Sequence, residues 1–468
     1  MKIVYVVHYY LPQHQAGTEV YTAALARKMK ELGHQVSVFT SEDGVPKSGR
    51  FELREDRWED IPVFRLVRTE PPDFERSYLD PEIDKIFAKF LEKKNPDVVH
   101  FQHTFRLSVG MLSESARAGC RTLLTLADFW HVCPPILMLQ PGFALCPGPA
   151  PDRCARCGNA VGALYSGAPG SSLSSASNKY ARMAGRSISS GADRAVRGVH
   201  WAKRRVPSAL VEVARSWKRS AEERDPVSAY SKKLEMLEKR AELMKKNISE
   251  VDLVLAPSRF MKKIMVEAGA VDAQKIVHSD YGFEHGPFEG IGRKASTNIR
   301  FGFIGTPVEH KGLHVLVAAM NSIADTDAEL RVYGDLSWFP AYAKKLRRLA
   351  LNPRTRFMGR FEHGDIARVL SEIDVLVVPS LWYENSPLTI HEAFMAGAPV
   401  LVSDIGGMAE LVEDGGGLTF AVGDDEDLSR KMRRLVEEKG LMGSLRKSIP
   451  KVKTVEEDAA ELLKYYSP

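Results

Sequence analysis

Short apolar segments of strand length alternate with amphipathic helical patterns in both halves of this 468-residue chain. Strands that are joined by helices run parallel, and parallel sheets are covered by helices on both faces. The alternation therefore predicts an α/β protein with doubly wound sheets. The expected strands are residues 2–7, 34–40, 97–101, 122–126 and 251–256 in the first half, and 299–304, 329–333, 355–358, 375–378 and 399–403 in the second.

The length of the chain suits two domains, each large enough to bury its own core. We expect a first domain over residues 1–290 and a second over 298–450, with a polar, glycine-containing linker near 286–297. A terminal segment, 451–468, carries a helical pattern that is expected to pack back on the first domain. The predicted fold is two Rossmann-like domains that face a central cleft, where ligands bind at the carboxyl ends of the strands.

Composition excludes several classes of protein. The longest apolar runs are only strand-sized, so no segment is expected to span a bilayer. The N-terminal residues MKIVYVVHYYLP are typical of a first strand rather than a signal peptide, which predicts a cytoplasmic protein. No G-x-G-x-x-G follows the first strand and no P-loop motif occurs, so dinucleotide and P-loop sites are disfavoured.

The stretch YENSPLTIHEA, residues 383–393, follows an expected strand and begins a helix. Asn385 or Ser386 is a plausible N-cap, and Pro387 suits the first helical turn. Free amides at such a helix start bind phosphate. Glu392, one to two turns further on, is then placed to hold an attached ribose, and Glu384 to meet a sugar beyond the phosphates. The alternative is that both carboxylates simply solvate a surface helix.

Two further segments join a strand to a helix in the same way. Gly305 ends the expected strand 299–304, and Lys311 stands just before the next helix, where it can point a cation at a diphosphate. The alternative is an ordinary surface lysine. Gly17 and Thr18 lie between the first strand and its helix, where a small residue permits close approach of a ligand to the backbone.

Taken together, the segments GTPVEHKG, VVPSLWYENSPLTIHEAFMAGAPVLVSDIGG and MAELVEDG closely resemble the retaining nucleotide-sugar glycosyltransferases of family four, which have the GT-B fold. The resemblance is strong over residues 299–428, moderate over 1–133 and partial over 134–250. It implies a donor that is a nucleotide-diphosphate sugar and an acceptor that is a glycan or a lipid-linked saccharide. It also implies a role in cell-surface polysaccharide or glycolipid synthesis.

The resemblance also assigns roles by position. Glu392 is implied to hold the ribose, Glu384 the donor sugar's hydroxyl groups and Lys311 the diphosphate. The remaining donor-binding residues implied are Gly17, Thr18, Gly305, Asn385, Ser386, Pro387 and Leu388. The chemistry implied has no protein nucleophile, because an oxygen of the leaving phosphate takes the acceptor's proton. The cation of Lys311 and the helix start then stabilise the diphosphate without a divalent metal.

This chain departs from the family pattern at two places. Thr306 stands where many relatives have an arginine after the glycine. Ala127 stands where relatives often have a histidine near the donor sugar, so Asp128 and His131 become the candidate substitutes, with Asp128 the residue expected in catalysis. Two alternatives stay open, a catalytically silent binding or scaffold protein and a nucleotide-sugar epimerase of the same fold.

Four of the five cysteines, Cys133, Cys146, Cys154 and Cys157, fall within 25 positions of a Pro/Gly-rich loop and end in a C-x-x-C. Four thiolates form a closed tetrahedral site, so we predict a structural zinc with no catalytic role. The resemblance adds support, because a subset of relatives carries a similar insertion. The alternatives are unpaired loop cysteines or a redox pair.

Positive charge is concentrated in one segment. Residues 165–250 contain 18 Lys and Arg against 9 Asp and Glu, whereas the whole chain carries a net charge of only +5. Residues 178–246 are basic and largely helical in pattern, with tryptophans near the basic clusters, which suits an anionic membrane surface. The prediction is a peripheral contact that brings the cleft to a lipid-linked acceptor. The alternative is a solvated helical insertion, and no nucleic-acid-binding module accompanies the charge.

Overall fold

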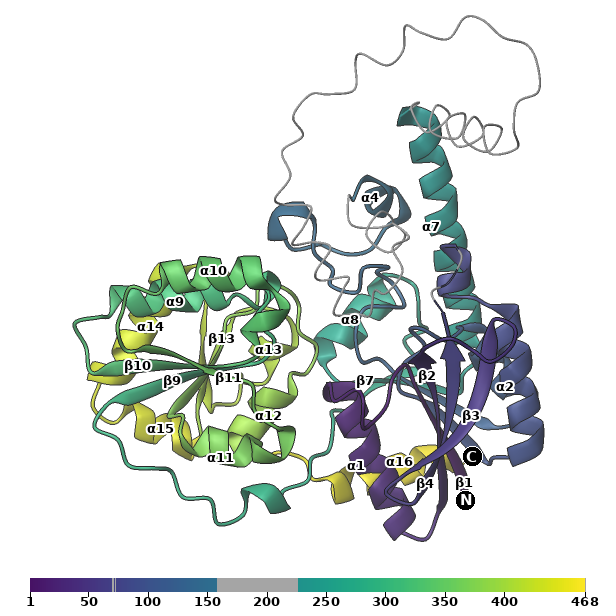
Figure 1. Cartoon of the computed structure of the whole chain (residues 1–468), viewed down its shortest axis with the longest axis horizontal. Coiled ribbons are helices and arrows are strands. Elements are labelled where there is room, and N and C mark those ends of the chain that lie inside the picture. Colours follow the sequence, from purple (N-terminus) through teal and green to yellow (C-terminus); the bar gives the residue numbers. More distant parts are fainter. Residues whose placement is uncertain (70, 72, 158–225, 468) are drawn as a thin grey trace, which may run out of the picture.

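The computed structural model describes residues 1–69, 71, 73–157 and 226–467. Two α/β domains lie side by side, each with helices packed around a sheet (Figure 1). The first sheet has eight strands in the order β3-β4-β2-β1-β5-β6-β7-β8, and the second has six in the order β11-β10-β9-β12-β13-β14. The doubly wound α/β fold predicted from the alternating pattern is confirmed.

The first domain holds the larger sheet. Its strands are β1 (Lys2–Val7), β2 (Gln35–Asp43), β3 (Phe51–Trp58), β4 (Ile61–Arg68), β5 (Val98–Phe101), β6 (Arg121–Thr125), β7 (Leu253–Ala256) and β8 (Ile276–His278). Every pairing is parallel except that of β3 with β4. The principal helices are α1 (Gly17–Glu31), α2 (Pro81–Lys94), α3 (Gly110–Arg117), α4 (Pro151–Arg156), α7 (Pro226–Ser249) and α8 (Arg259–Glu267).

The second domain holds the smaller sheet, which is parallel throughout. Its strands are β9 (Ile299–Ile304), β10 (Ala328–Tyr333), β11 (Thr355–Gly359), β12 (Val375–Val378), β13 (Val400–Ser403) and β14 (Gly417–Phe420). Its helices are α9 (Leu313–Ser322), α10 (Pro340–Leu349), α11 (Ile366–Ser371), α12 (Leu388–Met395), α13 (Gly406–Glu410), α14 (Asp425–Glu437) and α15 (Leu441–Lys447).

The terminal helix α16 (Val455–Tyr466) lies against the first domain, next to α1 (Figure 1). Its last residue, Tyr466, is buried, and its hydroxyl lies 2.7 Å from Nδ1 of His100 and 3.1 Å from the hydroxyl of Tyr5. Near the start of α16, Asp458 accepts a hydrogen bond from the Tyr21 hydroxyl of α1 at 2.8 Å. These buried contacts tie the end of the chain to strands β1 and β5.

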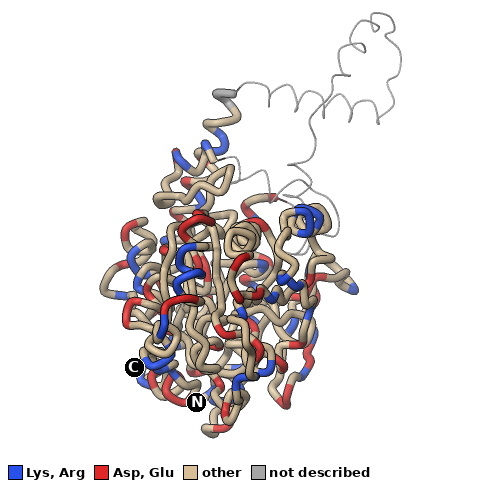
Figure 2. The backbone as a smooth tube through the Cα atoms, turned by 90° about the vertical axis from the view of Figure 1, so that its left-hand side faces the viewer, with Lys and Arg blue, Asp and Glu red and all other residues tan. Residues whose placement is uncertain are grey.

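Part of the basic segment is visible as α7, which projects from the first domain beside α4 (Figure 1). The clusters at 203–205 and 218–219 lie outside the described residues. Over the described chain, positively and negatively charged residues are interspersed along the backbone rather than gathered (Figure 2). Among the described helices, none combines the length and the apolar character needed to cross a bilayer.

Candidate active site

The loop after β12 places the Glu384 carboxylate among three hydrogen-bond donors. The side chain is buried, and Oε1 accepts hydrogen bonds from Lys311 Nζ at 2.6 Å, Ser380 Oγ at 2.8 Å and Trp382 Nε1 at 2.9 Å. Burial alone would raise the pKa of Glu384, but Lys311 and these hydrogen bonds hold the pKa below its usual value. Glu384 is therefore a fixed, ionised carboxylate rather than a solvated surface residue.

Lys311 reaches Glu384 because two loops pack very closely. Gly312 follows it with a φ of 69°, and a Cβ on this glycine would lie 1.7 Å from the carbonyl oxygen of Pro379, which precedes the Glu384 loop. The Leu381 amide also donates to the His310 carbonyl at 2.8 Å. Only glycine permits both the left-handed conformation and the approach. The Lys311 side chain stays 30% exposed, so the ammonium group is accessible from the cleft.

The expected N-cap is wrong. Helix α12 begins at Leu388 with Pro387 as its N-cap residue, and no described side chain caps it. Asn385 instead crosses to the first domain, where Nδ2 donates to the carbonyl oxygens of Leu126 at 2.7 Å and Ala127 at 3.2 Å. The side-chain oxygen Oδ1, the atom that could cap the helix amides, instead accepts a hydrogen bond from Ser258 Oγ of the first domain at 2.7 Å. The Asn385 amide group therefore joins the two domains instead of closing the helix start.

Ser386 is also engaged elsewhere. Its hydroxyl donates to Asp280 Oδ1 at 2.7 Å and lies 2.8 Å from Nε2 of His391. Neither side chain therefore caps the helix, and no described side chain accepts a hydrogen bond from the first-turn amides of α12 as a cap. A phosphate site at this helix start therefore stays a prediction, and the helix that would form it begins at Leu388.

Glu392 lies in the second turn of α12 and is 6% exposed. Its Oε1 is 3.7 Å from Nε2 of His363, whose own pKa is lowered by burial. Burial raises the pKa of Glu392 to about 7. The two glutamates of one short motif thus have opposite perturbations, and the cause is the cation that Glu384 has beside it.

The first domain meets this site at two places. A Cβ on Gly17 would lie 3.0 Å from Cδ1 of Leu388, so the first residue of α1 packs against the first residue of α12, with Thr18 half-buried beside it. Gly305 follows β9, and a Cβ on Gly334 would lie 2.1 Å from its carbonyl oxygen. The contact of Gly17 with Leu388 brings together two of the predicted donor-binding residues, one from each domain.

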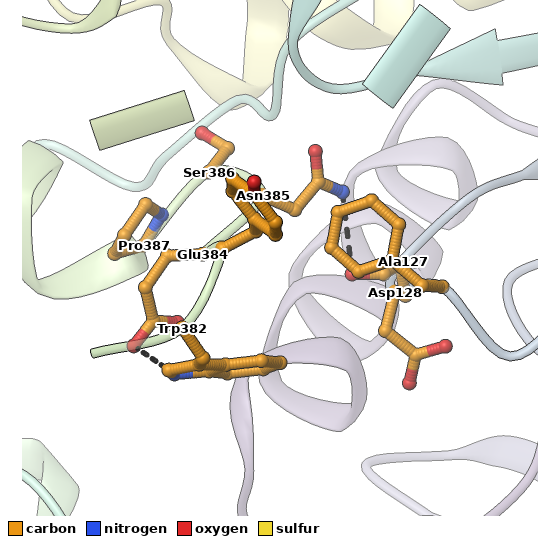
Figure 3. A pocket seen from close by; sticks show the side chains of 9 residues that line it. Ala127, Asp128, Trp382, Glu384, Asn385, Ser386 and Pro387 are labelled. Carbon is orange, nitrogen blue, oxygen red and sulfur yellow. Dashed lines mark hydrogen bonds between the residues drawn. The ribbon is translucent and has the colours of Figure 1, made fainter. Parts of the chain in front are cut away.

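A pocket of about 80 Å³ lies between the domains, lined by Ala127, Asp128 and Phe129 from the first and by residues 382–387 from the second (Figure 3). Asp128 accepts hydrogen bonds from His103 Nε2 at 2.9 Å and from the Trp130 amide at 2.8 Å. His131 does not line this pocket, and its Nε2 lies 3.2 Å from the Thr104 hydroxyl. Of the two candidate substitutes, only Asp128 faces the site.

His103 is a residue that the sequence analysis missed. It follows β5 by two positions, much as Asp128 follows the neighbouring strand β6. The carboxyl ends of adjacent parallel strands lie at one edge of a sheet, and that rule would have singled it out.

The cysteine loop shows no metal site. Cys133, Cys146, Cys154 and Cys157 are free thiols that pack on one hydrophobic cluster, and burial raises the pKa of Cys133 to about 12. Among the described residues, no group of three or more His, Cys, Asp or Glu side chains is arranged to hold a metal ion. A structural zinc stays a prediction, and it requires the four sulfur atoms to draw together.

Comparison with known proteins gives the family. Residues 16–142 match the family model described as Glycosyltransferase Family 4, and residues 298–438 match that of Glycosyl transferases group 1. This chain belongs to the family 4 glycosyltransferases. A glycogen synthase of Mycobacterium tuberculosis is 31% identical over 142 residues, and the spore coat protein SA of Bacillus subtilis is 30% identical over 121.

These alignments cover 29% and 24% of this family 4 chain and span about a third of each relative, 33% and 32%. Solved structures match over the full length. HepE of Anabaena in complex with UDP and glucose aligns with a TM-score of 0.58 at 16% identity, covering 99% of both chains. Sucrose-phosphate synthase of Thermosynechococcus elongatus aligns with a TM-score of 0.60 at 16% identity, covering 99% of this chain and 98% of that one. Such matches establish the GT-B fold.

Proposed function

We propose that this chain transfers a sugar, with retention of anomeric configuration, from a nucleotide-diphosphate sugar to a saccharide acceptor on a glycan or a lipid. The observation that carries the proposal is the Lys311–Glu384 pair at 2.6 Å, placed beside the uncapped start of α12 and facing the strand ends of the other domain. The similar HepE structures that are described with UDP and with UDP-glucose support a donor of this class.

Each part of the donor has a matching group. The amides at the start of α12 suit the phosphates, since a helix N-terminus binds anions. Glu392, one turn further along the helix, suits the two ribose hydroxyl groups once it is ionised. Glu384 is already ionised and suits hydroxyl groups of the transferred sugar. Lys311, which donates a hydrogen bond to Glu384, supplies the positive charge for the diphosphate.

The proposed reaction needs no protein nucleophile. The acceptor hydroxyl oxygen forms a bond to the anomeric carbon on the face that the diphosphate leaves, and the bond from that carbon to the phosphate oxygen breaks. The hydroxyl proton passes to the departing phosphate oxygen, and the nucleoside diphosphate is released. Lys311 and the amides of α12 stabilise the negative charge that develops on the diphosphate, the usual source of catalysis in such a site.

The acceptor and the membrane contact form the outer part of the proposal. The positive excess over residues 165–250 favours an acceptor presented at an anionic surface, such as a lipid-linked saccharide. Replacing Lys203, Arg204 and Arg205 by glutamine is expected to reduce binding to vesicles that contain phosphatidylglycerol. Unchanged binding would remove the membrane contact and leave the donor site untouched.

The main test is a thermal-shift screen of nucleotide-diphosphate sugars, UDP-glucose among them, followed by transfer to a panel of alkyl glycosides. A donor should stabilise the wild type and have little effect on Glu392→Ala. Transfer should fall at least 100-fold in Lys311→Ala and stay unchanged in Lys344→Ala, which removes an exposed lysine of α10. NMR spectroscopy of the product should show the donor's anomeric configuration.

Two results would point to the other functions. Conversion of the nucleotide sugar to its epimer without any acceptor would indicate an epimerase. Stabilisation by a donor with no chemical turnover against any acceptor would indicate the silent binding protein that Ala127 suggests.

A further inference from the structure

Three imidazole rings gather beside the cleft at the carboxyl ends of adjacent strands. His8 follows β1, His103 follows β5 and His131 follows β6. The ring centres of His8 and His103 lie 4.5 Å apart, and those of His103 and His131 lie 6.3 Å apart. Nε2 of His8 is 3.5 Å from a carboxylate oxygen of Glu19, a buried residue in the first turn of α1. This buried polar cluster opens towards the donor site through Asp128.

The hydrogen bonds of His103 fix its tautomer. The Phe105 amide donates to Nδ1 at 2.8 Å, so Nδ1 acts as the acceptor. The ring proton then resides on Nε2 and is donated to Oδ2 of Asp128 at 2.9 Å. Both ring nitrogens are thus in use, and His103 is buried. It acts on the cleft only through Asp128, which makes it a positioning residue.

Asp128 is the exposed end of this arrangement. Oδ1 accepts from the Trp130 amide, Oδ2 accepts from His103, and 24% of the side chain remains exposed. A carboxylate oxygen can accept more than one hydrogen bond, so each oxygen retains capacity for a ligand. Glu384 and Asp128 extend to the same side of the pocket, with the indole ring of Trp382 between them (Figure 3). Ala127 contributes only a methyl group there.

A fixed carboxylate of this kind selects its ligand by charge and by hydrogen-bonding type. A phosphate group is repelled, whereas a neutral group that donates a hydrogen bond is attracted. Of the parts of a nucleotide-sugar and its acceptor, only sugar hydroxyl groups are such donors close to the bond being made. Two carboxylates that flank an indole ring, with the cation of Lys311 beyond Glu384, suit a polyhydroxylated ring.

We propose that the His103–Asp128 pair is a site for a hydroxyl group of the reacting sugars, with Asp128 making the contact and His103 holding its carboxylate in place. The proposal rests on the proposed glycosyltransferase function. The hydroxyl group belongs either to the transferred sugar of the donor or to the acceptor, and the experiment distinguishes the two sources.

The charges around Asp128 agree with this role. Burial would raise the pKa of Asp128, but His103, the Trp130 amide and His8 together lower it below its usual value. His131 and the Tyr281 phenol are the further titratable groups near it. Asp128 therefore stays ionised, as an acceptor of a hydroxyl hydrogen bond, at mildly acidic pH.

The experiment compares Asp128→Asn, His103→Ala and His103→Gln, with His278→Ala as the matched control because His278 is exposed at the end of β8. Binding of UDP and of UDP-glucose is measured by calorimetry, and glucose transfer is measured with the acceptor found in the glycoside panel. UDP binding reports whether each variant retains its fold and its nucleotide site. The control is expected to match the wild type in all three measurements.

If the hydroxyl group belongs to the donor, Asp128→Asn should weaken UDP-glucose about tenfold and leave UDP unchanged, as expected when one hydrogen bond loses its charge assistance. If it belongs to the acceptor, both affinities should stay unchanged and kcat/KM for the acceptor should fall at least tenfold. The quantity that Asp128→Asn reduces, either UDP-glucose affinity or kcat/KM for the acceptor, is then measured against pH in the His103 variants. In His103→Ala its loss on the acidic side should begin at a higher pH than in the wild type. In His103→Gln, which keeps an N–H donor, the loss should begin at the wild-type pH.

A variant Asp128→Asn that changes none of these quantities by more than twofold would overturn the site while leaving the proposed function intact. An effect of His103→Ala without any shift of the pH profile would overturn the positioning role. A wild type that binds neither UDP nor UDP-glucose and transfers no glucose would overturn the proposed function for this donor, and the inference with it.

Discussion

Replacing Glu392 by Gln is expected to stabilise the free protein above pH 7 while weakening its affinity for a nucleotide. Glu392 is 6% exposed, and burial raises its pKa to about 7, whereas a glutamate in an unfolded chain has a pKa of about 4.3. A carboxyl group whose pKa is raised by folding favours the folded state below the unfolded pKa. That contribution is lost progressively as the pH rises through the folded pKa.

The magnitude follows from the two pKa values. At about 1.4 kcal/mol for each tenfold change in proton affinity, the ionised side chain costs on the order of 3 kcal/mol of unfolding free energy above pH 7. Glutamine does not titrate and escapes this cost. The difference in unfolding free energy between Glu392→Gln and the wild type should therefore grow by about 3 kcal/mol from pH 4.5 to pH 8.5, measured by urea titration.

The matched control is Glu437→Gln on α14, which removes an exposed carboxylate paired with Arg433. Surface pairs of this kind contribute less than about 1 kcal/mol, so its stability should change little at either pH. UDP affinity should fall about 10- to 100-fold in Glu392→Gln, because a charge-assisted hydrogen bond to the ribose is lost. As the pH rises through 7, the UDP affinity of the wild type should increase more steeply than that of the variant. The variant lacks the Glu392 carboxyl group, so its pH dependence reflects only the phosphates of UDP.

A stability difference that is the same at both pH values would show that Glu392 is not buried as an isolated carboxyl group. UDP binding equal in variant and wild type would refute its assignment to the ribose.

Three further perturbations test the surroundings of the site. Lys311→Met leaves the buried Glu384 carboxylate without the cation bonded to it, which should lower the unfolding free energy by about 3 kcal/mol at pH 8; adding Glu384→Gln in the same chain should recover most of the loss. Asn385→Ala removes the hydrogen bonds to the Leu126 and Ala127 carbonyls, so small-angle scattering should show a more open pair of domains, and an unchanged radius of gyration would contradict this. Metal analysis of anaerobically purified protein is expected to find one zinc per chain, absent from Cys154→Ser; a metal-free wild type would end the zinc prediction.

The sequence predicted most of the sheet because buried parallel strands are nearly continuous apolar runs. The β3–β4 hairpin was missed. Strand β4 (IPVFRLVR) is itself a buried and largely apolar run, but β3 and the turn do not have the composition typical of a hairpin. Strand β3 (FELREDRW) is an edge strand in which most residues are charged and few are apolar. Its two-residue turn places Glu59 and Asp60 at φ values of 48° and 59°, a left-handed conformation that usually signals itself by glycine or asparagine. Neither β3 nor the turn therefore has the sequence pattern by which such elements are usually predicted.

The site shows the same limit at the level of side chains. Spacing along the chain placed Glu384 and Glu392 near a helix start, and that placement holds. It did not foresee that Lys311, 73 residues earlier, bonds to Glu384, because that contact depends on the approach of Gly312 to Pro379. It also assigned Asn385 to a local cap, whereas acceptors from the other domain take the side chain. Local rules fail where groups distant in the sequence bind both the donor and the acceptor of one side chain.

The opposite perturbation of the two glutamates has a consequence for how a donor would enter. Glu384 is ionised before binding because its cation is already present, whereas Glu392, with a pKa of about 7, is partly protonated at neutral pH in the free protein. A nucleotide that uses Glu392 as an acceptor must therefore release a proton at that residue. Its diphosphate must also draw Lys311 partly away from Glu384, which frees a lone pair on that carboxylate for a sugar hydroxyl group. Under the proposed function, binding of the phosphates would thus prepare the sugar site, and a nucleoside monophosphate, which lacks the second phosphate, should couple to Lys311 more weakly than the diphosphate does.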